Sequence, residues 1–196
     1  MKRMIVYAAM VALGMWLWLP GTAIAGEKRV GAADQAFAME AASSGLAEVQ
    51  LGKTGVDRAS RPEVKRLAQR IVEDHTKANQ ELARIAEQKD IDVPDEAGDV
   101  HQDVAELFSK LEGAEFDREY LLHHVMDHEK GVAQYAAQAN MGQDPELKAF
   151  AARHLPVLRE HLQMARDLVA GQRAVGQEGT TPGGAPGAAP GERTGR

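Results

Sequence analysis

Residues 60–85 read SRPEVKRLAQRIVEDHTKANQELARI. Apolar side chains and one histidine recur every three or four positions in this stretch, which is the spacing of one face of an α-helix. The members of this face are Val64, Leu67, Ile71, His75, Ala78, Leu82 and Ile85. Before them, Ser60, Pro62 and Glu63 form the pattern of an N-cap, a proline in the first turn and a capping box. The stretch therefore predicts a long amphipathic helix that ends before Pro94.

The same spacing recurs on both sides of this helix. It predicts further long helices over residues 34–59, 114–140 and 144–170, and a short one over 98–111. Pro156 lies inside the last of these and is expected to kink it. Aromatic residues make up only 5% of the chain, which also favours helix over sheet. We predict an all-α protein: an up-down-up-down four-helix bundle with an extra short helix between its second and third helices.

The two ends of the chain differ in composition from this domain. Lys2 and Arg3, an uncharged apolar run from Ile5 to Leu19, and small residues up to Ala25 predict a signal peptide over residues 1–25. The apolar run is too short to span a bilayer, so no membrane-spanning segment is expected after cleavage. Residues 26–33 are predicted to be a linker, 34–170 the helical domain, and the Gly- and Pro-rich residues 171–196 a disordered tail. A cleaved signal predicts export, and the periplasm fits a chain without cysteine.

Composition excludes several classes of function. The chain has no cysteine, which excludes disulfides, thiolate metal sites and c-type haem attachment. A formal net charge of −6 and scattered basic residues argue against nucleic-acid binding. No nucleophile elbow or phosphate-binding loop is present, so nucleophilic hydrolysis is not expected. A redox enzyme with a metal centre stays open, although it would also need an open coordination position and a substrate channel. Methionines at helical spacing are typical of a hydrophobic core, so a haem with a methionine ligand is not expected.

One sequence motif occurs twice: Val-x-Asp-His-x-Lys is found at residues 72–77 and again at 125–130. Residues of metal-binding type also fall near one level of the predicted bundle. From the turn near residue 60, Glu48 lies twelve residues back and His75 fifteen forward. From the turn near residue 143, His128 lies fifteen back and His161 eighteen forward. In each pair the mismatch of three residues is an axial offset of about 4.5 Å at 1.5 Å per residue. Each of the four long helices contributes one such residue: Glu48, His75, His128 and His161.

Imidazole nitrogens and a carboxylate are suitable ligands for Zn, Fe, Mn or Cu. Further candidates are either hydrogen-bond partners of these ligands or alternative ligands: Asp74, Asp127, His124 and His154. The other interpretation is a buried polar layer that binds no metal and is satisfied by internal hydrogen bonds. Glutamate three residues before histidine, the di-iron carboxylate pattern, does not occur, so a ferroxidase of that kind is not expected.

Several of these motifs, in this order, resemble a bacterial family, domain of unknown function 4142, whose members are often labelled predicted outer membrane proteins. The matching segments are Phe37 to Gly52, Val72 to Asn79, Gly113 to Asp117, Val125 to Lys130 and Leu155 to Leu162. The resemblance implies a ferritin-like four-helix bundle in an exported protein. The family's glutamate, its two Asp-His pairs and its Leu-Pro…His motif correspond here to Glu48, to Asp74-His75 and Asp127-His128, and to Leu155-Pro156…His161.

Two functions follow as expectations. The first is a periplasmic protein that binds a transition metal in the middle of the bundle, for metal buffering or stress protection. The second is a metal-free envelope or stress protein that acts through its surface and tail. A homo-oligomer or an envelope partner fits either expectation, and the sequence identifies no substrate.

Overall fold

The computed structural model describes residues 30–178, with side chains up to residue 171. Five helices account for most of this range: α1 Ala32–Arg58, α2 Pro62–Gln88, α3 Asp99–Phe108, α4 Gly113–Met141 and α5 Pro145–Glu178. Apart from an isolated bridge between Ala59 and Gly113, residues 30–178 contain no β-structure, so the all-α prediction is confirmed. No helix in this part of the chain is long and apolar enough to cross a membrane.

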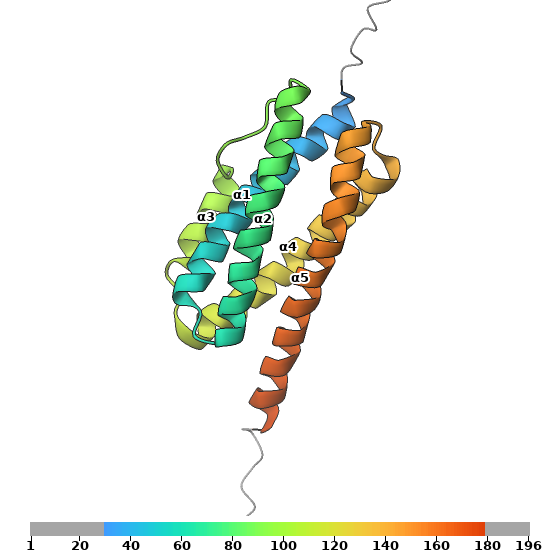
Figure 1. Cartoon of the computed structure of the whole chain (residues 1–196). Helices are drawn as coiled ribbons and strands as arrows, with labels where there is room; N and C mark the ends of the chain where they lie inside the picture. The colour runs from blue at the N-terminus through green and yellow to red at the C-terminus, as the bar shows by residue number, and fades with distance from the viewer. Residues whose placement is uncertain (1–29, 179–196) are drawn as a thin grey trace, which may run out of the picture.

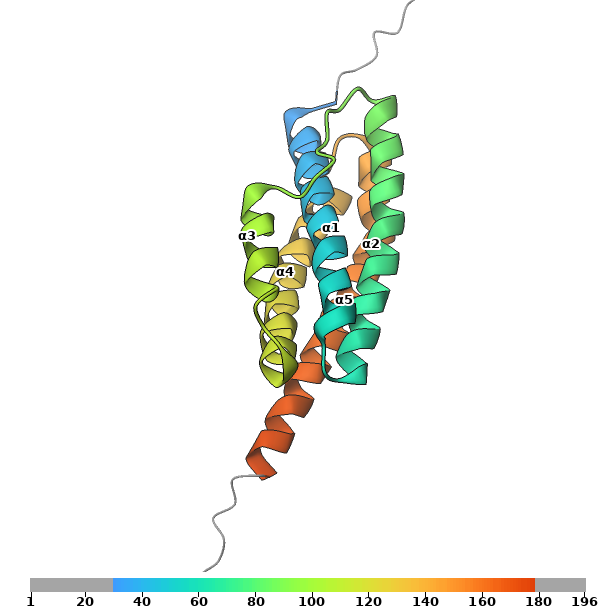
Figure 2. The same cartoon turned by 90° about the vertical axis from the view of Figure 1, so that its left-hand side faces the viewer.

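The predicted ends of the domain need one correction. α5 continues through Pro156 and on to Glu178, so residues 171–178 are helical rather than part of a disordered tail. The predicted signal peptide (1–25) and the rest of the predicted tail (179–196) lie outside the described residues. α5 consequently extends past the ends of α1 and α4 at one end of the molecule (Figures 1 and 2).

The direction of the helices differs from the predicted up-down-up-down order. Ala59, at the end of α1, pairs with Gly113, at the start of α4. At the other end of the molecule, Asp34 at the start of α1 bonds to the backbone of Asp144, next to the start of α5. α2 and α4 therefore run in one direction and α1 and α5 in the other (Figure 1). The segment containing α3 spans the length of the molecule between α2 and α4 (Figure 2), which explains why the predicted order is wrong.

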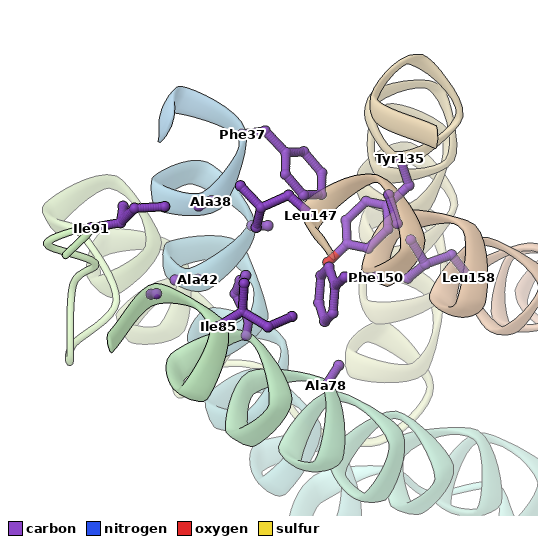
Figure 3. Packing of buried hydrophobic residues seen from close by; sticks show 14 residues of the cluster. Phe37, Ala38, Ala42, Ala78, Ile85, Ile91, Tyr135, Leu147, Phe150 and Leu158 are labelled. Atoms are coloured by element: carbon purple, nitrogen blue, oxygen red, sulfur yellow. The ribbon is translucent and has the colours of Figure 1, made fainter. Parts of the chain in front are cut away.

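The four long helices pack so that α1 lies between α2 and α4, and α5 lies against the same two helices. Buried apolar residues form two separate clusters along this arrangement. One contains Phe37, Tyr135 and Phe150 and lies at the end where α1 and α5 begin (Figure 3). The other contains Leu67, Phe116 and Tyr120 and lies at the opposite end, where α3 also packs against α1. The helices thus bury a hydrophobic core at each end, with a different layer between them.

A buried aspartate holds the turn at each end of the bundle. Asp117 of α4 is completely buried and accepts hydrogen bonds from the backbone N–H of Ser60 (2.9 Å) and Arg61 (3.0 Å) and from the Ser60 hydroxyl. The predicted capping box is therefore wrong, because the Ser60 hydroxyl donates to Asp117 instead of capping α2. At the other end, Asp34 of α1 accepts bonds from the N–H of Asp144 (2.8 Å) and the side chain of Gln138 (2.7 Å).

Two glycines of α1 allow close helix packing. A Cβ atom added at Gly52 would lie 2.7 Å from a methyl carbon of Val72 in α2, and one at Gly55 would lie 2.7 Å from the ring of Tyr120 in α4. Both distances are well inside van der Waals contact. Gly113 has a different role: its φ of +59° forms the turn into α4, a conformation that other residues adopt only at a cost.

Candidate metal centre

The layer between the two hydrophobic clusters is made of histidine and carboxylate side chains. Its five members are all at least nine-tenths buried: Glu48, His75, His124, His128 and His161. They come from all four long helices, at the level where the apolar residues of each helix give way to polar ones. All four residues predicted at one level are in this layer, although the counting used turns that lie at opposite ends of the molecule. The four residues still share one level because each lies near the middle of a long helix.

The alternative candidates divide into three groups. His124 lies inside the layer, one helical turn before His128. Asp74 borders it, because its carboxylate accepts a hydrogen bond from Nε2 of His161 (3.1 Å). His154 lies outside the layer and instead bonds to Glu81 (2.9 Å), while Asp127 lies 3.5 Å from His123 at the edge of a cavity.

The five members form two overlapping groups of potential metal ligands. His75, His128 and His161 offer nitrogen atoms that lie within 4.8 Å of one another. Glu48, His124 and His128 form a second group by the same measure. His128 belongs to both groups and has one ring nitrogen near each: Nε2 lies 3.3 Å from Nδ1 of His161, and Nδ1 lies 3.7 Å from Glu48.

The hydrogen bonds of the first group determine which nitrogens carry lone pairs. Nδ1 of His128 lies 3.1 Å from the carbonyl oxygen of His124, which can only accept, so this nitrogen is the N–H donor. Nε2 of His161 is likewise the donor to the Asp74 carboxylate. In the neutral rings, the remaining nitrogens are then bare acceptors. Nε2 of His128 and Nδ1 of His161 thus face each other at 3.3 Å with no proton between them.

Two facing lone pairs repel unless a cation lies between them, and their separation matches that of two metal ligands. Two nitrogens bound to Zn²⁺ at about 2.05 Å with tetrahedral angles are about 3.3 Å apart. Nε2 of His75, which has no hydrogen-bond partner in the described structure, supplies a third nitrogen. The donation from His161 to Asp74 is the usual way in which a carboxylate orients a metal-binding histidine.

Burial keeps these rings neutral, as metal binding requires. It lowers the pKa of His124 and of His128 to about 4. Burial, together with the neighbouring histidines, also lowers the pKa of His75 well below its ordinary value. For His161, the effect of burial outweighs the hydrogen bond to Asp74, and the pKa is again lowered.

The second group contains polar atoms with no partner. Oε2 of Glu48 and Nδ1 of His124 are 3.1 Å apart, but their orientation does not form a hydrogen bond. Nε2 of His124 also has no partner, and the whole side chain is inaccessible to solvent. Burial raises the pKa of Glu48. Such unsatisfied buried groups cost about 1–3 kcal/mol each, so their presence needs a physical explanation.

A cavity of about 30 Å³ connects this layer to the face between α1 and α4. Its inner wall includes Glu48, His75 and His128, and its outer wall includes Glu40 and Asp127. A space of this size holds one or two water molecules. Three carboxylates and one cationic side chain line it, and Lys130 pairs with Glu40 (2.6 Å). Glu48 and Asp127 are then the carboxylates left to favour a cation over an anion.

Sequence reasoning did not anticipate how the ligands divide. It placed Glu48 with His75, His128 and His161, whereas the structure places Glu48 beside His124. The i, i+4 spacing of His124 and His128 was the available signal for that pair. The buried aspartates Asp34 and Asp117 were missed altogether, because an acidic residue near a helix end usually faces solvent.

Comparison with known proteins supports the fold. The helical chain is similar to the crystal structure of a DUF305 fragment from Deinococcus radiodurans, with a TM-score of 0.64 and 13% identity over 72% of this chain and 97% of that one. It is also similar to a putative spore coat protein from Bacillus halodurans, with a TM-score of 0.58 and 9% identity over 83% of this chain and 98% of that one. At these identities the likeness concerns the fold alone.

No curated protein matches the sequence significantly. The model of one family, described as a domain of unknown function (DUF4142), matches residues 19–168. This range covers α1 to α4, most of α5 and every residue of the histidine and carboxylate layer. The resemblance found in the sequence is therefore confirmed, and the chain belongs to the domain of unknown function 4142 family.

Proposed function

We propose that this protein is exported and binds a divalent transition metal with His75, His128 and His161, for metal buffering or protection against metal stress. The donors are three neutral imidazoles, which suit Zn²⁺, Cu²⁺ and related ions better than Mg²⁺ or Ca²⁺. Export rests on the signal-like residues 1–25, and the level of the site rests on the described helices.

The observation that carries the proposal is the pair of bare nitrogens on His128 and His161. Both rings use their other nitrogen as a hydrogen-bond donor, so neither can place a proton in the 3.3 Å gap without becoming charged. Burial opposes that charge, as the lowered pKa values of both residues indicate. A metal ion removes the conflict, because it accepts electron density from both nitrogens at once.

The surrounding residues have supporting roles in this proposal. Asp74 fixes the ring of His161, and Arg70 in turn donates to Asp74 (3.2 Å). The pKa of Asp74 is lowered, because the hydrogen bonds from His161 and Arg70 outweigh the effect of burial, so the carboxylate stays ionised as an acceptor. The acidic wall of the cavity attracts a cation towards the layer from the face between α1 and α4.

We also infer a ferritin-like arrangement of the four long helices. A single long connection between the second and third long helices distinguishes ferritin-like bundles from bundles with short loops only. The segment between α2 and α4, which contains α3, is such a connection. Ligands projecting inward from all four helices are also typical of metal sites in bundles.

Metal content of tag-free protein, purified from its native compartment, tests the proposal. Elemental mass spectrometry should find near-stoichiometric transition metal in the wild-type chain. His75→Ala and His161→Ala should each lose most of it, since each removes one of three ligands. The matched control is His154→Ala, which lies on the same helix as His161 but bonds to Glu81, and it should retain the metal.

Three outcomes would contradict the proposal. The first is wild-type protein that is isolated without metal and binds no Zn²⁺, Cu²⁺ or Co²⁺ at micromolar concentration. The second is full retention of metal by both His75→Ala and His161→Ala. The third is equal loss in His154→Ala, which would indicate a general effect on folding. The first outcome would favour a structural polar layer and direct attention to the protein surface.

A further inference from the structure

The second group of ligands remains unexplained by a single ion on three histidines. His124 is fully buried, neither of its ring nitrogens has a hydrogen-bond partner, and Oε2 of Glu48 is unpaired as well. A polar layer without metal would be expected to join the two as a hydrogen-bonded pair. Instead, the carboxylate oxygen and Nδ1 of His124 lie 3.1 Å apart in an orientation that forms no such bond.

From this arrangement we infer that Glu48 and His124 hold a second divalent transition metal ion beside the first, with Nδ1 of His128 as their shared third donor. An oxygen and a nitrogen bound to one metal at about 2.0–2.1 Å lie about 3 Å apart at angles between octahedral and tetrahedral. The observed 3.1 Å agrees with this separation. The inference rests on the proposed function, because His128 would also bind the first ion through Nε2.

The third donor requires one rearrangement. Nδ1 of His128 donates to the carbonyl of His124 at 3.1 Å and lies 3.7 Å from Oε1 of Glu48. On binding, the His128 ring turns so that Nδ1 points away from the carbonyl of His124 and towards Glu48. The second ion then takes the place of the Nδ1 proton, which passes to solvent, and the ring becomes an imidazolate between two ions. The carbonyl of His124 keeps its hydrogen bond from within α4.

Charge balance is consistent with two ions. Two divalent ions bring four positive charges into the interior. The carboxylates of Glu48, Asp74 and Asp127 and one imidazolate supply four negative charges next to them. The positive charges of Arg70, beside Asp74, and of Lys130, at the cavity, are offset by Glu160 (2.8 Å) and Glu40 (2.6 Å). Asp74 contacts the first group through His161, and Asp127 lines the cavity beside Glu48 and His128. A buried cluster of low net charge avoids the large cost of an isolated buried charge.

The test is the stoichiometry of Co²⁺ bound to the full chain after removal of metal, measured by equilibrium dialysis and elemental analysis. Wild-type protein should bind two ions per chain. His124→Phe keeps an aromatic ring against Tyr120 and should bind one, and Glu48→Gln should also bind one. The matched control, His154→Phe, alters a histidine outside the layer and should still bind two. Circular dichroism of each metal-free variant checks that the helices form.

A second measurement uses Cu²⁺. Two Cu²⁺ ions on opposite nitrogens of one imidazolate are magnetically coupled, so the wild-type chain should show a reduced electron paramagnetic resonance signal that His124→Phe restores. One Co²⁺ per wild-type chain, or two in His124→Phe, would overturn this inference and leave the three-histidine site intact. No bound metal in the wild type would overturn the proposed function as well.

Discussion

Lowering the pH from about 7 to about 5 should strongly destabilise the metal-free protein. Burial lowers the pKa of both His124 and His128 from 6.5 to about 4. The unfolded chain therefore binds more protons than the folded one in the window between these values. Since protons then favour unfolding, stability is complete above pH 6.5 and is lost progressively as the pH falls towards 4.

The size of the effect follows from the same values. Between pH 7 and pH 5, the preferential protonation of each of these histidines in the unfolded chain lowers the unfolding free energy by about 2 kcal/mol, at 1.36 kcal/mol per pKa unit. Together they contribute about 4 kcal/mol. The lowered pKa values of His75 and His161 act in the same direction, whereas the raised pKa of Glu48 acts against them. A typical domain has only about 5–15 kcal/mol of stability, so the loss is easily measured.

Urea unfolding followed by circular dichroism at several pH values is the assay. His124→Phe removes one of these two contributions and should reduce the pH dependence by about 2 kcal/mol. It should also stabilise the metal-free chain at neutral pH, because it removes two unpaired buried nitrogens. The reasoning would be refuted by an unfolding free energy that does not change between pH 7 and pH 5, since that would mean the imidazoles are hydrated in the folded chain.

Three further predictions concern single residues. Asp117→Ala should lower the unfolding free energy by about 2–3 kcal/mol, because the α1–α2 turn loses three hydrogen bonds to a carboxylate, as measured by urea denaturation. Gly55→Ala should cost about 1–3 kcal/mol in the same assay, because the added methyl group overlaps the ring of Tyr120. Asp74→Asn should weaken Zn²⁺ binding roughly ten- to hundredfold in a competition titration, because it weakens the hydrogen bond that orients His161.

Exposed positions supply controls for these substitutions. Asp57→Ala, on the surface of α1, should change stability much less than Asp117→Ala. Gly171→Ala meets no atom within 4 Å and should be neutral or slightly stabilising, as expected for alanine in an exposed helix. Asp167→Asn, exposed on α5, should leave Zn²⁺ affinity unchanged. An equal effect in each pair would contradict the structural explanation for the corresponding variant.

The helices were largely predictable because their signals are local. The spacing of Val64, Leu67 and Ile71 reflects the 3.6-residue turn, and Asp144 caps α5 through the N–H groups of Glu146 and Leu147. Repeats along one helix face are properties of neighbouring residues. For that reason the predicted start of the helix at Pro62 and the predicted end of α4 before Gly142 agree with the structure to within a few residues.

The order of helix directions was not predictable by the same reasoning. A connection that reverses the chain and one that spans the bundle can have similar composition. The segment between α2 and α4 spans the molecule, with α3 packed along α1 and the ring of Phe108, at the end of α3, edge-on to Phe116 and Tyr120 of α4. That choice depends on contacts between distant residues, which no local pattern records.

The sequence by itself determined that the chain is helical, which face of each helix is buried, and which residues of metal-binding type interrupt those faces halfway along. These features depend on the spacing of residues along the chain, which is the same whatever the tertiary structure. Only the tertiary structure decided that Asp34 and Asp117 hold the turns, that His154 stays apart, and that His128 has one nitrogen near each group of ligands. Those outcomes depend on helix direction and rotation, because a side chain acquires its partners only when another helix brings them within a few ångströms.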